Sequence, residues 1–235
     1  MKSRDRFCLQ AFWLSLTFLA CLTPVGAVTL FPGDSLPLSG TTTSDRPEIG
    51  APVFTTQLAN FQQTDVIGNV LFSGTVEQRV RQFPLGGILI DYQITNFTDN
   101  GEGFRITALD TNHHYGSMLD VDYRLDEMGD VAPNAAIWPD FTFDPAFNDA
   151  PVSFNFPDSL LSGNTSRDMF VVTYGGDIVV YGAHGAQLTV AGQSGDIYQV
   201  SFESFSAIIP IPPALYLFAT GLLGLPGMAR RKAAY

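Results

Sequence analysis

Residues 88–96 read Ile88-Leu-Ile-Asp-Tyr-Gln-Ile-Thr-Asn96, and this stretch decides the expected fold. Its apolar side chains occupy every second position: Ile88, Ile90, Tyr92 and Ile94. Polar side chains fall between them: Asp91, Gln93 and Thr95. Because successive side chains of a strand point to opposite faces, a period of two with one apolar face predicts a strand half buried in an antiparallel sheet.

The same alternation recurs along the chain in four further runs: 119–125, 152–156, 187–190 and 198–202. Glycine-bearing turns separate such runs, as at Gly192-Gln-Ser-Gly-Asp196, and no segment of the body has ten or more residues of helical period. Short strands at regular spacing predict an all-β body over residues 53–207. We expect an antiparallel β-sandwich, of which a jelly roll is one form. In 119–125, Asp120 and Asp122 are expected on the outward, solvated face.

The composition sets limits on chemistry and partners. Between Val28 and Ala207 the chain has 22 acidic residues, six arginines and no lysine, a net charge of −16. So acidic a body would repel phosphate backbones, which argues against a nucleic-acid partner. Both cysteines, Cys8 and Cys21, lie in the first 21 residues, so the body has no disulfide framework and no thiol nucleophile.

Residues 28–52 precede the first regular alternation. The part from Pro32 to Pro52 is rich in Gly, Ser, Thr and Pro and has no period of either two or 3.6. Such composition is typical of linkers. We therefore expect a flexible N-terminal arm before the sandwich.

Residues 1–27 have the three parts of a secretory signal. Lys2, Arg4 and Arg6 form a positive start, 7–22 is uncharged and mostly apolar, and Val25-Gly-Ala27 supplies the small residues before a cleavage site. The sequence predicts export and cleavage by signal peptidase after Ala27. An uncleaved anchor and a lipoprotein signal ending at Cys21 are the alternatives.

Residues 208–235 form a second targeting segment. From Ser204 to Ala229 there is no charge, which exceeds the roughly 20 residues that cross a bilayer, and Pro213 suits the first turn of a helix. The basic stop follows at once: Arg230, Arg231 and Lys232. Because positive residues remain on the cytoplasmic side, the sequence predicts one C-terminal transmembrane helix with the body outside the cytoplasm.

The tail resembles the PEP-CTERM sorting domain, and within it the VPLPA-CTERM variant. The matching motif consists of Pro210, Ile211, Pro212, Pro213 and Ala214, preceded by Ile209 and followed by a glycine-rich span and the basic stop. Ile211 replaces the acidic residue of the eponymous motif, and Ile209 replaces valine. The resemblance covers about the last 28 residues. It implies a Gram-negative bacterium that makes exopolysaccharide, transient residence in the inner membrane, and cleavage by an exosortase, a membrane-embedded protease. A plain single-span anchor is the alternative.

No catalytic pattern appears in the body. A serine hydrolase needs a nucleophile, a histidine and an acid in register, and neither that pattern nor a phosphate-binding glycine loop is present. We therefore expect a non-catalytic protein with no obligatory cofactor. A glycosidase, which needs only two carboxylates, is a third alternative.

Two features of residues 120–149 suggest ligands. The acidic residues of this segment include a candidate calcium set: Asp126, Glu127, Asp130, Asp140 and Asp144. Oxygen ligands crowded into loops suit calcium, although the spacing is not that of an EF-hand. Trp138 lies among them and could stack on a sugar ring or pack in the core.

The main expectation is an exported surface or matrix protein, sorted through its tail and associated with exopolysaccharide or biofilm. The alternative is a calcium-assisted carbohydrate-binding module.

Overall fold

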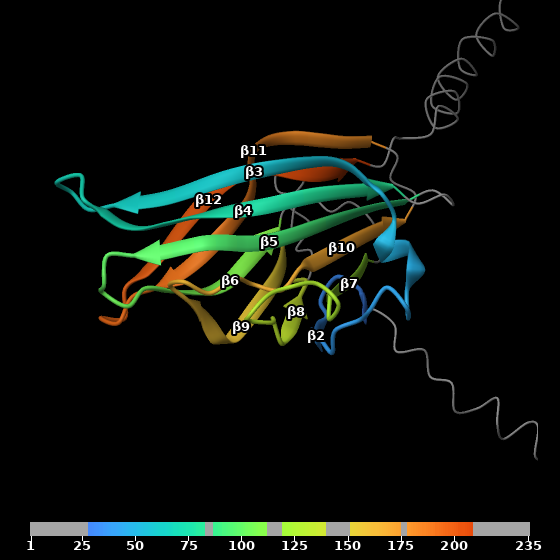
Figure 1. Ribbon diagram of the computed structural model, residues 1–235, viewed down its shortest axis with the longest axis horizontal. Helices are drawn as coiled ribbons and strands as arrows, with labels where there is room; N and C mark the ends of the chain where they lie inside the picture. The colour runs from blue at the N-terminus through green and yellow to red at the C-terminus, as the bar shows by residue number, and fades with distance from the viewer. Residues whose placement is uncertain (1–27, 83–86, 112–118, 140–150, 175–177, 209–235) are drawn as a thin grey trace, which may run out of the picture.

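The computed structural model describes residues 28–82, 87–111, 119–139, 151–174 and 178–208 (Figure 1). The described chain is all-β, with one short 3-10 helix, so the predicted fold class is confirmed. The first half comprises β1 (Val28–Leu30), β2 (Ser35–Pro37), η1 (Pro47–Gly50), β3 (Val53–Thr64), β4 (Val70–Gln82), β5 (Gly87–Asp99) and β6 (Arg105–Thr111). The second half comprises β7 (Leu119–Tyr123), β8 (Ala135–Ile137), β9 (Val152–Leu161), β10 (Met169–Tyr174), β11 (Ile178–Ala191) and β12 (Ile197–Ile208).

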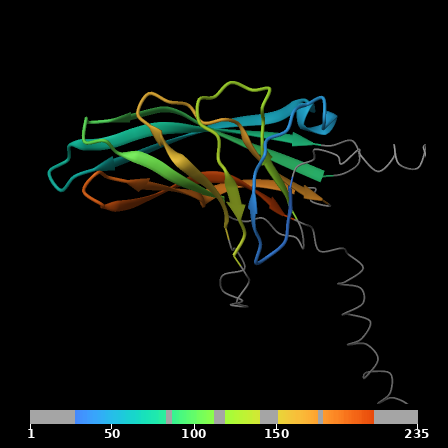
Figure 2. The same ribbon diagram turned by 90° about the horizontal axis from the view of Figure 1, so that it is seen from below.

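The strands form two antiparallel six-stranded sheets that lie face to face, as the view from below shows (Figure 2). Sheet A has the order β1-β7-β10-β5-β4-β3, and sheet B has the order β12-β11-β6-β9-β8-β2. Several consecutive strands lie in different sheets, so β5 pairs with β10 while β6 pairs with β9. The chain thus forms the predicted sandwich, with its core between the sheets.

The stretch that predicted the fold lies at the centre of sheet A. It belongs to β5, which is bonded to β10 on one side and β4 on the other. Its four alternating apolar side chains are at most 2% exposed and face sheet B. At one end of the core, five aromatic rings contact one another with centroids 5.2 to 6.3 Å apart: Phe61, Phe72, Phe97, Phe104 and Tyr198. Aromatic burial of this kind lets the body form a core without disulfides.

The expected flexible arm is wrong, because residues 28–52 are built into the sandwich. β1 pairs with β7 in sheet A, and β2 pairs with β8 in sheet B. The strands are only three residues long, too short to show a period of two, so the composition of the segment concealed them. Residues 40–52, here called the N-terminal cover, then lie over the outer face of sheet A. There Ile49 packs against Leu89, Phe170 and Val172 as a small second core.

The cover also overturns the expected exposure of Asp120 and Asp122. The two side chains do point away from the main core, but Asp122 is fully buried and Asp120 is only 8% exposed. The Gly40 N–H donates to Asp122 Oδ1 at 2.9 Å, and Arg46 Nη1 lies 3.3 Å from Asp120 Oδ2. The polar face of an alternating strand is therefore buried wherever a third layer covers it.

The predicted secretory signal and the predicted C-terminal sorting signal both lie outside the described residues. These comprise the signal with its cleavage residues Val25 and Ala27, the proline motif at 210–214 and the basic stop at 230–232. Within the part of the chain that the structure describes, no helix has the length and apolar character needed to span a membrane.

Candidate functional site

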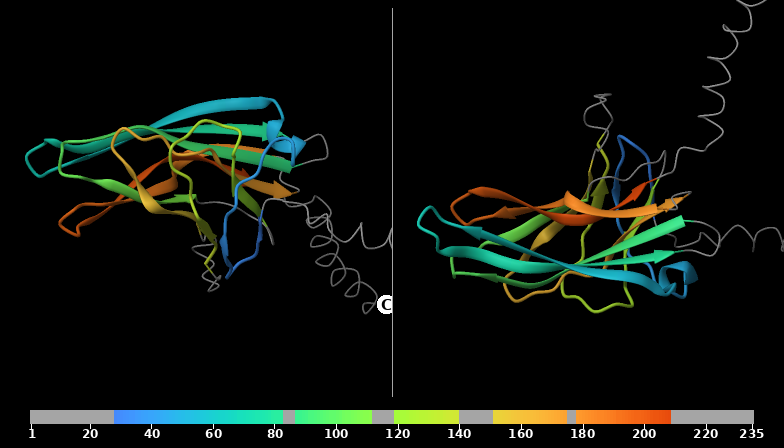
Figure 3. Two further views of the ribbon diagram at one scale, coloured as in Figure 1. Left: turned by 60° about the horizontal axis from the view of Figure 1, so that its bottom comes forward. Right: turned by 90° about the horizontal axis from the view of Figure 1, so that it is seen from above.

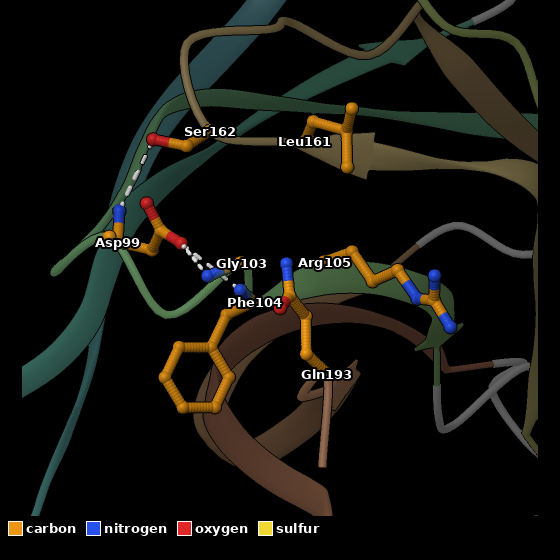
Figure 4. Close-up of a pocket in the computed structure, with 8 residues that line it drawn as sticks. Asp99, Gly103, Phe104, Arg105, Leu161, Ser162 and Gln193 are labelled. Carbon is orange, nitrogen blue, oxygen red and sulfur yellow. Dashed lines mark hydrogen bonds between the residues drawn. The ribbon is translucent and has the colours of Figure 1, made fainter. Parts of the chain in front are cut away.

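A shallow pocket of about 400 Å³ lies at one end of the sandwich (Figure 4). It is lined by the end of β5, the β5–β6 turn, the end of β9 and the β11–β12 turn. The lining residues are Asp99, Gly101, Gly103, Phe104, Arg105, Leu161, Ser162 and Gln193. β12 begins at this end and finishes at the other, where Ile208 pairs with Ile178 (Figure 1). Twelve residues of strand separate the two ends by roughly 36–40 Å.

Asp99 holds the β5–β6 turn in shape. Its Oδ2 accepts the N–H groups of Gly103 and Phe104 at 2.7 and 3.0 Å, and its own N–H donates to Ser162 Oγ at 3.2 Å (Figure 4). Gly101 and Gly103 have φ of +93° and +70°, a conformation that favours glycine. The turn is thus fixed by backbone geometry, and Asp99 joins two walls of the pocket, the turn through its carboxylate and Ser162 through its backbone N–H.

Gln193 closes another side of the pocket by lying directly against Gly103. A Cβ atom at Gly103 would be 2.2 Å from Gln193 Nε2, so any other residue there would displace the Gln193 side chain as well as adopt the positive φ. Gln193 is itself exposed in the β11–β12 turn, and its amide can donate and accept hydrogen bonds at the pocket surface.

Arg105 supplies a cationic group. The other arginines of the body donate to carboxylates or backbone carbonyls: Arg46, Arg79, Arg81, Arg124 and Arg167. Arg105 is exposed and forms no hydrogen bond or ion pair with any described side chain. Figure 4 shows its side chain extending away from Asp99, on the side of Leu161. The pocket therefore offers a guanidinium, an amide, a hydroxyl and a carboxylate, a set suited to a small ligand rich in hydroxyl groups.

The sequence patterns did not predict that these residues line a pocket. Asn100-Gly101 and Gly103 indicate a turn, and Arg105 follows it directly, but nothing local shows that Ser162 and Gln193 meet that turn. The β9 and β11–β12 segments reach it only because β9 pairs with β6 and β11 pairs with β6 on its other side.

The predicted calcium ligands are not brought together among the described residues. Asp126 and Glu127 lie 3.2 and 2.8 Å from Arg124, and Asp126 Oδ2 also accepts hydrogen bonds from Thr43. Partial burial acts to raise the pKa of Asp126, but these hydrogen bonds and Arg124 hold it well below its usual range. The Asp130 carboxylate accepts the Thr165 N–H at 2.9 Å.

Asp140 and Asp144 lie outside the described residues. Within those residues, no three acidic, histidine or cysteine side chains are placed to hold a metal ion. The positions of Asp126, Glu127 and Asp130 therefore do not support the calcium hypothesis.

The interpretation of Trp138 as a sugar-stacking residue is wrong, and core packing is its role. Its side chain is fully buried within the main core. The Trp138 N–H donates to the Asp34 carbonyl at 2.9 Å and its carbonyl accepts the Gly33 N–H at 2.7 Å. The segment before β2 thus holds Trp138 in place, and the ring has no face free for a ligand.

A buried ionic cluster lies beneath the N-terminal cover, on the outer face of sheet A. Arg81 Nε is 2.6 Å from Asp91 Oδ2 and donates through Nη1 to the Ala51 carbonyl, while Arg79 Nη2 is 2.6 Å from Asp168 Oδ2. Burial and the negative charge of Asp91 raise the pKa of Asp168 to about 7, although the positive charge of Arg79 opposes this shift. Arg81 joins the cluster to the cover, and the carboxylates of Asp91 and Asp168 are fully buried, so we assign the cluster a structural role.

Compared with known proteins, the chain matches no family model, no curated protein and no solved structure. The fold and the pocket therefore stand on their own geometry, and any function must be argued from them and from the two terminal segments.

Proposed function

We propose that this chain is an exported, non-catalytic surface or matrix protein of a Gram-negative bacterium. In this proposal the signal at 1–27 directs export and is removed by signal peptidase. The tail at 208–235 then holds the body at the outer side of the inner membrane until an exosortase-like protease cuts it. The β-sandwich is the part that this cleavage releases, and it becomes part of the exopolysaccharide layer.

One observation supports this division most directly. β12 ends at Ile208, and the proline motif begins two residues later, at Pro210. Proline fixes φ near −65° and has no amide donor, so Pro210 and Pro212 resist both helix and sheet. The motif would therefore stay extended between the last strand and the membrane-spanning segment. An extended backbone is the form that a protease cleft accepts.

The test replaces both prolines, Pro210→Ala with Pro212→Ala, in the full chain in a strain that has an exosortase. We expect the parent to lose the residues after about Pro212, and the double variant to remain in the inner membrane at full length. Pro226→Ala is the matched control, because it lies in the same apolar span outside the motif. Identical, uncut tails in the parent and the double variant would make the protein an ordinary single-span membrane protein.

The pocket favours a second candidate function, binding of a saccharide unit at the end of the sandwich far from the tail. A protein held by residues 208–235 would present this end away from the membrane. Hydroxyl groups of a sugar would bond to Gln193, Ser162 and Asp99, and the carboxylate of a hexuronate would pair with Arg105. This site differs from the earlier alternative because it uses neither calcium nor Trp138.

Binding of hexuronate and neutral hexose oligosaccharides to the full chain in detergent tests this candidate. We expect tighter binding of the hexuronate and a loss of at least about tenfold in Arg105→Gln, the effect of one charge-assisted hydrogen bond. Gln193→Ala should weaken both ligands, whereas Gln199→Ala, an exposed amide on β12, should not. Equal binding by the parent and Arg105→Gln would exclude the pocket as the site.

A further inference from the structure

The four edges of the two sheets differ in how they are protected. Edge strands expose unpaired N–H and C=O groups and are normally shortened, charged or covered. β1 and β2 are only three residues long. β12 is long, but the buried Gln78 of β4 donates to the Glu203 carbonyl and accepts the Phe205 N–H, so part of its free edge is covered.

β3 is the exception. It is twelve residues long and, among the described strands, forms backbone pairs only with β4, although it also lies close to β12 of the other sheet. Its bulges are confined to its two ends, which leaves a regular stretch from Thr55 to Gln63. Eight of its twelve residues are exposed. Figure 3 shows the strand along the outer border of its layer.

The sequence of β3 has none of the usual protections. Val53-Phe-Thr-Thr-Gln-Leu-Ala-Asn-Phe-Gln-Gln-Thr64 contains no charged residue, no proline and no glycine. Of eleven large apolar side chains exposed in the described residues, five belong to β3 and the turn after it, and a sixth is Val70, the first residue of β4. Phe54 is 76% exposed and Leu58 is 61% exposed. A long, open and apolar edge is a surface for adding another strand.

The absence of charged side chains on β3 makes a second copy of this chain the strand that fits this edge. The body has a net charge of −16, so most of its surface repels another copy. β3 itself carries no carboxylate, so two β3 strands can pair without placing like charges opposite each other. Its threonine, asparagine and glutamine side chains carry no charge and can hydrogen-bond to polar side chains that face them across an antiparallel pair. Antiparallel pairing of two β3 strands about a two-fold axis uses the same surface on both copies, as closed dimers do.

We propose that β3 pairs antiparallel with β3 of a second copy, which joins the two A sheets into one continuous sheet. Leu58 lies at the middle of the strand, so the two-fold axis passes close to it. Directly opposite side chains in an antiparallel pair are about 5 Å apart between Cβ atoms. Two copies of Leu58 are therefore neighbours, and Thr56 faces Asn60 of the other copy.

Cysteine cross-linking of the full chain, with Cys8 and Cys21 replaced by serine, tests the pairing. Leu58→Cys should form a disulfide-linked dimer under mild oxidation in detergent solution. Thr56→Cys and Asn60→Cys should cross-link with each other when the two variants are mixed. Val66→Cys, in the exposed turn after β3, and Met128→Cys, exposed in another part of the molecule, are the controls; both should still form the non-covalent dimer but should not become disulfide-linked.

A charge variant tests the same surface without a cysteine. Leu58→Lys places two like charges opposite each other and should reduce the mass measured by sedimentation from two copies to one. Met128→Lys adds the same charge to another exposed apolar residue and should leave the dimer intact. A monomeric parent, cross-linking as strong from the controls as from β3, cross-linking of β3 to other proteins only, or a dimer unaffected by Leu58→Lys would each overturn the proposal.

Discussion

At the scale of single residues, the N-terminal cover changes how the carboxylates beneath it titrate. Asp122 is fully buried, and its Oδ1 accepts the N–H groups of Gly40 and Tyr123. Its Oδ2 accepts no hydrogen bond from the described residues. Burial, only partly opposed by these hydrogen bonds and by Arg46, raises the pKa of Asp122 to about 6.

The raised pKa of Asp122 predicts a pH dependence of stability. Between about pH 4 and pH 6 the folded state keeps a proton that the unfolded state has lost, so the free energy of unfolding falls as the pH rises. The loss attributable to Asp122 is about 2–3 kcal/mol once the pH exceeds 6. Asp122→Asn keeps the Oδ1 acceptor and cannot ionise. We therefore expect the variant to gain stability relative to the parent between pH 4 and pH 7.

Urea unfolding at several pH values measures this difference. The exposed Asp158→Asn controls for the removal of one negative charge. A difference between the parent and Asp122→Asn that stays constant from pH 4 to pH 7 would contradict the buried titration of Asp122.

At the scale of elements, Gln78 determines how the two sheets meet at their edges. It lies on the core side of β4 and is fully buried, yet its amide bonds to two backbone groups of β12, at 2.8 and 3.1 Å. A polar residue among the apolar positions of a strand is here the connection that holds the edge of sheet B against sheet A.

Gln78→Leu preserves the size of the side chain and removes both hydrogen bonds. Because the Glu203 carbonyl and the Phe205 N–H lose a buried partner, we expect the free energy of unfolding to fall by about 1–3 kcal/mol. Hydrogen exchange should become faster at the Phe205 amide. Gln199→Leu changes an exposed amide of β12 in the same way and should alter stability by less than about 0.5 kcal/mol. Equal stability of Gln78→Leu and the parent would show that this contact does not hold the edge.

At the scale of the whole molecule, the proposed processing sites flank the paired strands. β1 begins at Val28, the residue after the expected cut, and pairs with Val121. β12 ends at Ile208, just before the proline motif. Both cuts would therefore leave every described strand intact.

Intact-mass spectrometry of the natural protein tests both ends together. We expect the mature chain to begin at Val28, because the cut after Ala27 spares β1, and to end near Pro212. A lipid-modified Cys21 at the start would restore the lipoprotein alternative. A chain that still ends at Tyr235 would contradict processing of the tail.

The sequence by itself determined the fold class and the inner faces of the long strands. Ile88, Ile90, Tyr92 and Ile94 could be placed in a core without any structure, because a strand has a fixed period of two and one apolar face must be buried. The two terminal segments are likewise local patterns, in which hydrophobic length and flanking charge carry the information.

Only the tertiary structure decided which polar faces are exposed, because burial depends on what packs above a strand. Asp91 and Asp122 occupy outer positions, as their alternation indicates, yet the N-terminal cover buries them. Trp138 is a core residue because the segment before β2 holds it against the main core. The pocket and the edge of β3 also depend on strand order. Gly103 lies against Gln193, and β3 is hydrogen-bonded to one strand, because of pairings between residues far apart in the chain, which no local pattern encodes.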